Sequence, residues 1–366
     1  MAEPLKNIYS ESFIRLLSEQ LESIIPDFNK SEFTEKIYDE TWDTLELKSR
    51  MRHISHTLHL FLPKPFPKAV NSILALTQEL KKLDIGGMGL AYMFLPDYIE
   101  AYGLEHTELS LEAFEEIVNI CSPEFAIRPF ILQDENTVMT KMYQWAESPN
   151  YLLRRFASEG CRPRLPWAMA LPAFKNDPSP IMPILEKLKA DDTLFVRKSV
   201  ANNLNDISKD HPELLVKTVK KWQHQHQHTD WILKHASRTL LKQGHKDILP
   251  LFGLVSPDDI SVELTNISSP ITIGNDGIFA FTIQNNASNV MLLRIEYAID
   301  YLKANGKHNR KVFKLSEITI GAKQTLKYSR KQSFANMTTR KHYKGLHRLS
   351  IIINGIEKAT TDFELM

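Results

Sequence analysis

An isolated carboxylate among arginines is the feature of this sequence best suited to chemistry. Residues 153–167 read L-R-R-F-A-S-E-G-C-R-P-R-L-P-W, with Glu159 in the middle and Trp167 at the end. Four arginines surround the glutamate: Arg154, Arg155, Arg162 and Arg164. An acid in such basic surroundings is a candidate for chemistry, and a group of arginines is suited to binding phosphates. The alternative is that Glu159 only forms ion pairs with its neighbours.

Helices are expected to position these residues. Up to about residue 255 the apolar residues recur at i, i+3 and i+4, beginning with Phe13, Leu17 and Leu21. Further runs with this spacing predict helices over residues 69–83, 111–120, 182–188, 214–222 and 231–241. Prolines and glycines separate the runs, as they do between helices of a globular protein.

A weak internal repeat indicates how the helices are arranged. The segments L-R-R-F-A-S (153–158), V-R-K-S-V-A (196–201) and L-K-H-A-S-R (233–238) share an apolar residue, two basic residues and small residues, at spacings of 43 and 37 residues. HEAT-type helix pairs recur at about this period, so the sequence predicts a curved α-solenoid. F-A-I-R-P-F-I (125–131) would be a degenerate copy. Coincidental helix pairs in a globular bundle are the alternative.

Stacked repeats would place cations and acids on one concave face. The basic pairs of the three segments would lie in line: Arg154 and Arg155, Arg197 and Lys198, and Lys234 with His235. Such a line binds a polyanion, unless the cations merely solvate their helices. Two more acids lie in similar surroundings, because Glu124 precedes F-A-I-R-P-F and Asp206 ends N-N-L-N-D. Glu159 and Asp206 would converge from adjacent repeats.

After Ser256-Pro257 the apolar period changes from helical to alternating. I-S-V-E-L, I-F-A-F-T-I and H-R-L-S-I-I-I alternate as half-buried strands do, and Asn305-Gly306 and Asn354-Gly355 are favourable hairpin turns. About 110 residues of short strands suggest an immunoglobulin-like β-sandwich. We therefore expect a mainly α protein with two domains, residues 1–255 and 256–366.

The predicted sandwich carries a second basic cluster. Between Lys303 and Arg348 there are thirteen lysines or arginines and one acid, Glu317, although the net charge of the whole chain is only +1. This imbalance points to nucleic acid or another anionic surface, contacted mainly at phosphates. Candidate contacts are Lys327, Arg330, Lys331, Arg340 and Lys341.

The remaining features argue against other classes of protein. Two cysteines in 366 residues favour a reducing compartment. The sequence shows neither a signal peptide nor a long apolar stretch, so we expect a cytoplasmic protein without membrane association. We also expect a monomer. Gly86-Gly87-Met88-Gly89 lacks the preceding strand and following lysine of a phosphate loop. The run Q-H-Q-H-Q-H (223–228) has no further ligand at suitable spacing. We expect no metal and no cofactor.

Three segments together resemble a known family. S-P-E-F-A-I-R-P-F, the stretch 153–167 and V-R-K-S-V-A-N-N-L-N-D are similar to the AlkC branch of the AlkC/AlkD DNA-alkylation-repair glycosylases, and so is the opening A-E-P-L-K-N-I-Y. The resemblance implies a HEAT-like solenoid followed by an immunoglobulin-like domain. It implies excision of 3-methyladenine and 3-methylcytosine from double-stranded DNA without a tight base-flipping pocket. It also implies that Glu124, Glu159 and Asp206 are the acids at the lesion, with Trp167 near the deoxyribose and Arg155 near the DNA.

The chemistry of such lesions agrees with these residues. A cationic alkylated base leaves without being protonated, so the enzyme needs only to stabilise the oxocarbenium-like sugar and orient a water. The face of the Trp167 ring can lie against the positive sugar. Release should be confined to labile lesions, and 8-oxoguanine should not be released. The competing hypothesis is a non-catalytic HEAT-repeat scaffold that binds DNA, in which Glu159 and Asp206 merely pair with arginines.

Overall fold

The computed structural model describes residues 3–83, 89–337 and 340–366, and these form two compact units. The first unit comprises the residues up to His211 together with Gln223–Ala236, and the second comprises Pro212–Trp222 and Ser237–Met366. Helices make up the first unit, and most of the second unit is β-sheet. The change in period predicted near residue 255 is therefore confirmed, while Gly86, Gly87 and Met88 lie outside the described residues.

The helices follow one another closely along the chain. Their bounds are α1 Glu11–Ile24, α2 Lys30–Ile37, α3 Leu47–Phe61, α4 Phe66–Lys82, α5 Phe94–Tyr102, α6 Thr107–Ile117, α7 Ile127–Gln133, α8 Glu135–Trp145, α9 Tyr151–Gly160, α10 Pro172–Asn176, α11 Met182–Leu188, α12 Leu194–Ile207, α13 Pro212–Trp222, α14 Gln227–Ala236 and α15 Arg238–Lys242. Short 3-10 turns lie at Leu5–Ile8, Trp42–Thr44, Leu90–Tyr92 and Pro250–Phe252. The expected run 231–241 is divided into α14 and α15 at Ser237.

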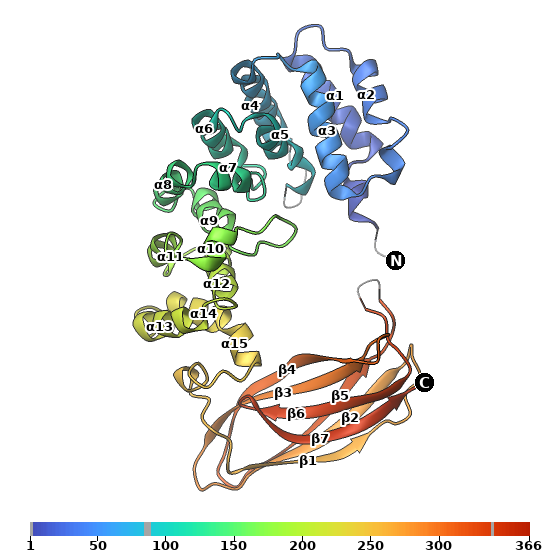
Figure 1. Cartoon of the computed structure of the whole chain (residues 1–366), viewed down its shortest axis with the longest axis vertical. Coiled ribbons are helices and arrows are strands. Elements are labelled where there is room, and N and C mark those ends of the chain that lie inside the picture. The colour runs from blue at the N-terminus through green and yellow to red at the C-terminus, as the bar shows by residue number, and fades with distance from the viewer. Residues whose placement is uncertain (1–2, 84–88, 338–339) are drawn as a thin grey trace. The chain divides into compact units, whose positions relative to one another are not determined.

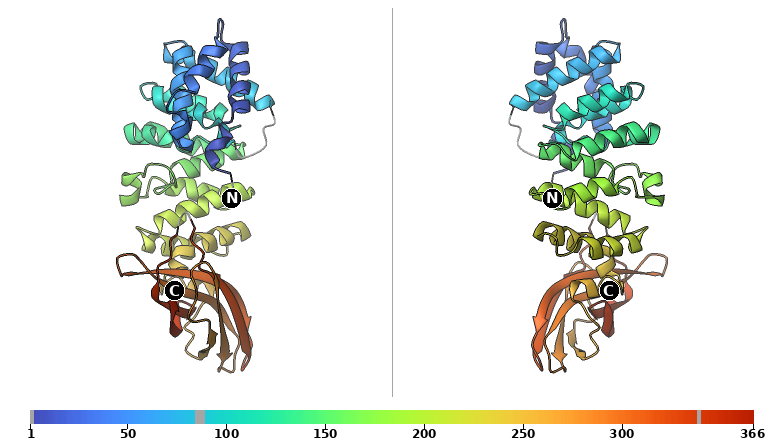
Figure 2. Two further views of the ribbon diagram at one scale, coloured as in Figure 1. Left: turned by 90° about the vertical axis from the view of Figure 1, so that its right-hand side faces the viewer. Right: turned by 90° about the vertical axis from the view of Figure 1, so that its left-hand side faces the viewer.

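Successive helices of the first unit pack in layers (Figure 1). In particular, α9, α12 and α14 are neighbours, with α12 packed against both of the others, and α11 contacts α9 and α12. The turned views of Figure 2 show the helices in the same order, with the colour running from the blue N-terminal helices through green. Side-chain caps begin several helices, as where Ser10 accepts a hydrogen bond from the amide of Phe13.

Phe156 shows what holds these layers together. Its ring stacks on Trp145 of α8 at 4.9 Å and meets Phe114 of α6 edge-on at 6.2 Å. Phe114 in turn meets Phe130 of α7 at 5.6 Å. Phe114, Phe130 and Phe156 are completely buried. Truncating such a residue to alanine costs about 3–5 kcal/mol, so this cluster fixes α9 against three earlier helices.

The described residues of the second unit form two antiparallel sheets. The strands are β1 Ile260–Ile267, β2 Asp276–Asn285, β3 Met291–Leu302, β4 His308–Ile320, β5 Thr325–Ser333, β6 Gly345–Ile353 and β7 Ile356–Leu365. One sheet has the order β1-β2-β5 and the other β4-β3-β6-β7. Alternate residues of β2 and β3 form the core, where Phe279 of one sheet lies 5.0 Å from Tyr297 of the other.

Both predicted hairpin turns are confirmed. Asn354 and Gly355 join β6 to β7 with φ of 46° and 78°, as a turn with two left-handed residues requires. Gly306 has φ of 74° between β3 and β4, and its amide donates to the carbonyl of Lys303. The cysteines, Cys121 and Cys161, both lie in the first unit and are free and buried.

Candidate active site

The ends of α9 and α12 carry two of the predicted acids. Asn150 caps α9 by accepting a hydrogen bond from the amide of Leu152 (3.0 Å). Asn203 of α12 donates to the carbonyl of Ser158 (2.8 Å) and is completely buried. This hydrogen bond sets the two helices in register, so that Glu159 of α9 lies beside Asp206 of α12.

Arg162 joins these two carboxylates. Its Nη1 lies 2.6 Å from Oε1 of Glu159, and its Nε lies 2.9 Å from Oδ2 of Asp206. The three residues are only 5%, 6% and 1% exposed in the order Glu159, Arg162, Asp206, so solvent screens the pairs little. Burial alone lowers the pKa of Arg162, but the two carboxylates outweigh burial and the pKa is raised. Lys209 lies 2.9 Å from the other oxygen of Asp206.

Arg155 connects the third acid to this pair. Its Nη1 forms an ion pair with Glu124 and donates to Oγ of Ser122 (2.8 Å), while its Nη2 lies 3.8 Å from Oε1 of Glu159. The guanidinium also lies over the ring of Phe195, 4.4 Å from its centroid. The side chain of Arg155 is 13% exposed, so this residue faces the acids while keeping limited access to solvent.

Acids and cations therefore alternate along one line of contacts. The order is Glu124, Arg155, Glu159, Arg162, Asp206 and Lys209. All three predicted acids are brought together, and the arginines that were expected to bind phosphates hold them. Fixed carboxylates that are shielded from water can stabilise positive charge with little reorganisation. Contact of Arg155 and Arg162 with DNA stays a prediction.

Trp167 lies in the loop between α9 and α10. It is 60% exposed and has φ of 66°, a left-handed conformation that costs energy for a large side chain. The Nζ of Lys48, in the first turn of α3, donates to the carbonyl of Trp167 (2.8 Å). A strained, exposed aromatic residue held from a distant helix has a conformation that its neighbours impose. The structure thus fixes the backbone of Trp167 and leaves its ring accessible.

Arg128 holds both ends of the same loop. It is completely buried, and its guanidinium donates to the carbonyls of Gly160 (3.0 Å), Arg162 (2.9 Å) and Met169 (2.6 Å). Burial lowers the pKa of Arg128 to about 10, so it remains charged at neutral pH. Sequence reasoning missed both Arg128 and Lys48. Arg128 stands in the segment F-A-I-R-P-F that was compared with the repeat, whereas nothing in the sequence singles out Lys48.

Two of the predicted DNA-binding arginines hold loops. Nη1 of Arg154 donates to the carbonyls of Ser148 and Pro149 (both 3.0 Å), and Nη1 of Arg197 donates to those of Asp191 (2.9 Å) and Asp192 (2.8 Å). Arg197 and its two carbonyl partners each lie 43 residues after Arg154 and its partners, which is the spacing of the sequence repeat. Arg154 also pairs with the carboxylate of Asp191 (2.6 Å).

The other predicted cations of the first unit lie nearer the surface. Arg164 pairs with Asp210, with its Nη2 at 2.6 Å and a side chain that is 38% exposed. Lys198 is exposed and Lys234 is half-buried. Phosphate contacts by Arg164, Lys198 and Lys234 stay predictions.

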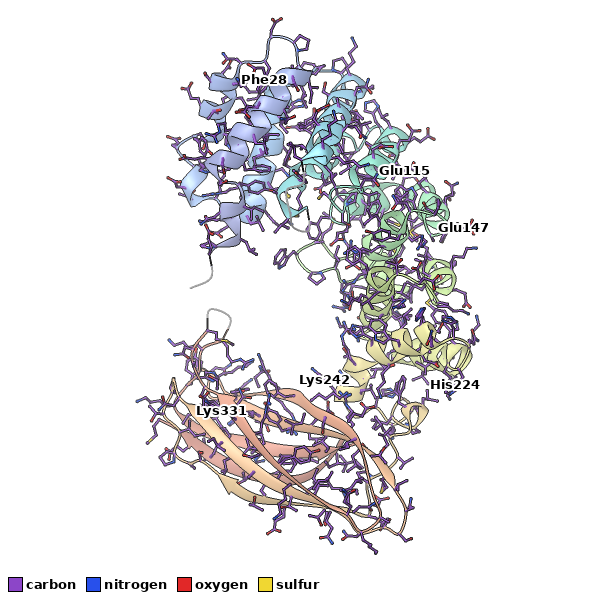
Figure 3. All side chains as sticks on the ribbon, turned by 180° about the vertical axis from the view of Figure 1, so that it is seen from behind. Phe28, Glu115, Glu147, His224, Lys242 and Lys331 are labelled. Atoms are coloured by element: carbon purple, nitrogen blue, oxygen red, sulfur yellow. The ribbon has the colours of Figure 1, made fainter. Side chains whose placement is uncertain are left out.

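The predicted basic residues of the second unit also reach its surface. Lys327, Arg330 and Lys331 belong to β5 and are exposed, and Lys331 is labelled in Figure 3. Lys331 pairs with Asp276 of the neighbouring strand at 2.7 Å. Arg340 lies over the ring of Tyr301, and Lys341 lies 5.9 Å from the ring centroid of Tyr343.

A cavity that the sequence did not predict adjoins the acids. Its volume is about 490 Å³, and Ser122, Phe125 and Ala126 form one wall. Asp97 of α5 contributes a carboxylate that is only 2% exposed, and burial raises the pKa of Asp97 to about 6. The available signal was the single acid in the apolar run F-L-P-D-Y-I.

Other candidate chemistry finds less support. Burial raises the pKa of both cysteine thiols, that of Cys161 to about 12, so they are poor nucleophiles. Within the described residues, no group of three or more His, Cys, Asp or Glu side chains is arranged to hold a metal ion. Over the same residues, the helices are too short or too polar to cross a membrane.

Comparison with known proteins agrees with this geometry. Residues 122–240, which include Glu124, Glu159, Asp206 and Trp167, match the family described as DNA alkylation repair enzyme, and residues 261–366 match the C-terminal Ig-like domain of the uncharacterised protein YhaZ. The uncharacterised protein YhaZ of Bacillus subtilis (strain 168) is 47% identical over 99% of both chains. The solved structure of the alkylpurine DNA glycosylase AlkC of Pseudomonas fluorescens, bound to DNA containing an abasic site analog, is 35% identical over the full length of both chains, with a TM-score of 0.93. This chain belongs to the AlkC-type family of DNA alkylation repair enzymes.

Proposed function

We propose that this chain is a monofunctional DNA glycosylase, which hydrolyses the N-glycosidic bond of 3-methyladenine, 3-methylcytosine and similar cationic bases in double-stranded DNA. The observation that carries the proposal is the line of alternating charges through Glu124, Arg155, Glu159, Arg162 and Asp206. This line lies within the residues that match the DNA alkylation repair family. The solved AlkC relative was bound to an analog of an abasic site, which is the product that such a hydrolysis leaves.

The chemistry needs a site that favours positive charge on the sugar. As the bond from C1′ to the base nitrogen breaks, the electron pair stays with the nitrogen and C1′ becomes cationic. Glu159 and Asp206 would stabilise this cation, and one of the three carboxylates would orient the attacking water. The water gives its hydroxide to C1′ and its proton to a carboxylate or to solvent. The exposed face of Trp167 would lie against the sugar.

The rest of the chain would bind and position the DNA. In this proposal residues 1–255 form a HEAT-like solenoid with a concave binding face, and residues 256–366 form a β-sandwich that adds basic contacts. The exposed cations Lys198, Lys327 and Arg330 would contact phosphates. The lesion would be attacked through its deoxyribose, without being flipped into a tight pocket, and the protein would act as a monomer.

The test is base release from methylated double-stranded DNA by wild type and Glu159→Gln, followed by chromatography. Glutamine keeps the size of the side chain and a carbonyl oxygen for Arg162 but removes the charge. We expect Glu159→Gln to lose release by at least about a hundredfold, as when an electrostatic group is removed from a transition state. Its affinity for the DNA should stay equal or increase. Glu147→Gln, which removes an exposed acid paired with Lys187, is the matched control and should release bases like wild type.

Each other outcome has a distinct meaning. Release by wild type and Glu159→Gln alike would move the essential acid to Asp206 or Glu124. Absence of release by wild type, with DNA binding intact, would refute the glycosylase and leave the DNA-binding scaffold. Efficient release of 8-oxoguanine would contradict a mechanism that depends on a cationic leaving group.

A further inference from the structure

The cavity beside the candidate active site lies entirely within the helical unit. Side chains of α3, of α5 and of residues 122–126 line its volume of about 490 Å³, a size typical of small-molecule pockets. Leu45, Met51, Met93 and Pro96 supply apolar surface. A few charged groups converge on this surface: Lys48, Arg52, Asp97 and Glu100. Apolar walls with a few convergent polar groups are typical of a ligand site.

Asp97 is the unusual member of this group. Asp97 is only 2% exposed, and neither of its carboxylate oxygens accepts a well-oriented hydrogen bond from the residues that the structure describes. Nη2 of Arg52 lies 2.9 Å from Oδ1 of Asp97, but its hydrogen bond goes to Glu100 (2.7 Å). Arg52 and the nearby Ser55 hydroxyl compensate this buried charge in part, and a hydrogen-bond donor on a ligand would compensate it further. The same burial raises the pKa of Asp97 to about 6.

Two residues connect the cavity to the candidate active site. Ser122 lines the cavity and donates a hydrogen bond to Oε2 of Glu124 (2.8 Å). Lys48 also lines it, and the Nζ of Lys48 donates to the carbonyl of Trp167. A molecule in the cavity would therefore be separated from Glu124 and from the Trp167 loop by single side chains.

The charges of the cavity favour a neutral ligand. Lys48 and Arg52 balance Asp97 and Glu100, and burial together with Arg52 lowers the pKa of His56, which is neutral at pH 7. Both cations already have partners: Lys48 donates to the carbonyl of Trp167, and Arg52 pairs with Asp97 and Glu100. Little positive charge is therefore left to bind a phosphate. Asp97 and Glu100 are placed to accept hydrogen bonds from an amino group.

We propose that this cavity binds the free methylated nucleobase after its release, with the exocyclic amino group donating to Asp97. The inference rests on the glycosylase activity proposed above. Cleavage leaves the bonding electron pair on the ring nitrogen, so the base that was cationic in DNA becomes neutral when it departs. A neutral, flat heterocycle with one amino group then matches a neutral cavity with apolar walls and a buried acceptor.

The experiment is calorimetric titration of free 3-methyladenine into the full-length protein, combined with inhibition of base release by the same compound. We expect saturable binding and inhibition with wild type. Asp97→Asn should weaken both by at least about tenfold, equivalent to one hydrogen bond to a charged group, while the single-turnover rate of base release stays unchanged. Glu108→Gln, at an exposed acid of α6 outside the cavity, is the matched control and should bind like wild type.

The possible failures can be told apart. If wild type releases bases from DNA but free 3-methyladenine neither binds nor inhibits, the cavity is not a base site. Binding of deoxyadenosine monophosphate without binding of 3-methyladenine would make the cavity a nucleotide site and overturn the inference. If Asp97→Asn does not fold, the wild-type titration still shows whether the protein binds free 3-methyladenine. Glu100→Gln then serves as the second variant that tests the acids of the cavity. If wild type releases no base at all, the proposed function itself has failed.

Discussion

Two arginines only two residues apart should differ sharply in their contribution to stability. Arg162 is buried between Glu159 and Asp206, whereas Arg164 pairs with Asp210 and its side chain is 38% exposed. Their ion pairs have similar lengths, 2.6–2.9 Å for Arg162 and 2.6 Å for Arg164. The comparison of Arg162→Met with Arg164→Met therefore sets a buried arginine that joins two acids against an exposed arginine that pairs with one.

The magnitudes follow from what each substitution leaves behind. Arg162→Met leaves Glu159 with Arg155 at 3.8 Å and Asp206 with Lys209 at 2.9 Å, and both acids stay buried. Removing one partner of a buried pair costs about 3–5 kcal/mol when the remaining charge has no other partner. Because Arg155 and Lys209 still compensate the two acids in part, we expect a loss near the lower end of this range for Arg162→Met. Removing an exposed partner costs about 0–1 kcal/mol, so Arg164→Met should unfold almost like wild type.

Urea unfolding followed by tryptophan fluorescence measures this difference. Four of the five tryptophans lie in the helical unit, and only Trp222 lies in the other, so the signal reports mainly on the unit under test. The free energy of unfolding of Arg162→Met should fall well below that of Arg164→Met at neutral pH.

A clear outcome would refute this reasoning. If Arg162→Met is destabilised no more than Arg164→Met at neutral pH, the buried charges are compensated by something other than Arg162. The alternating line of acids and arginines would then not be what holds the site together.

Three further predictions test other parts of the structure. Burial holds the pKa of Asp97 at about 6, so between pH 4 and 6 the native state binds more protons than the unfolded chain, and the protein loses stability as the pH rises through this window. In urea unfolding, Asp97→Asn should therefore gain on the order of 3 kcal/mol in the free energy of unfolding relative to wild type across this window, and parallel pH profiles would contradict this. In calorimetry, Gly355→Ala should destabilise the second unit by more than Gly306→Ala. Both glycines have positive φ, but of the two only Gly355 would place a new Cβ against backbone, 2.5 Å from Cα of Gly244. Equal losses would mean that the strain of the positive φ is the only cause. Cys121 and Cys161 should resist iodoacetamide in the folded protein and react in urea, as mass spectrometry can show, and rapid labelling of the native protein would disprove their burial.

Local pattern was enough to predict much of the fold. The apolar run 182–188 coincides with α11, Met182–Leu188, and the alternating segments became β1, β2 and β6. These patterns work because burial on one face is decided within a few residues. The run 231–241 was predicted to be continuous and is interrupted at Ser237, which is completely buried. There the packing of the chain outweighed the local period.

Contacts between distant residues could not be predicted in the same way. Lys48 reaches the Trp167 carbonyl across 119 residues, and Arg128 reaches Met169 across 41. Periodicity tells which face of a helix is buried but not which loop will lie against it. Glu159 was found because it stands among arginines in the sequence, and the resemblance to the AlkC branch added Glu124 and Asp206. Asp97 stands among apolar residues and owes its state to burial.

The repeat explains which arginines hold the scaffold and which could serve the chemistry. Arg154 and Arg197 occupy equivalent positions and make equivalent contacts to the loop before their own helix, so these contacts belong to the repeat itself. The next position breaks the equivalence, because Arg155 holds Glu124 and Glu159, whereas its counterpart Lys198 is exposed. A structural role that these two segments share keeps its residue type at the spacing of 43 residues. A site that exists once needs residues found in one repeat only, and Arg155 and Glu159 meet that condition.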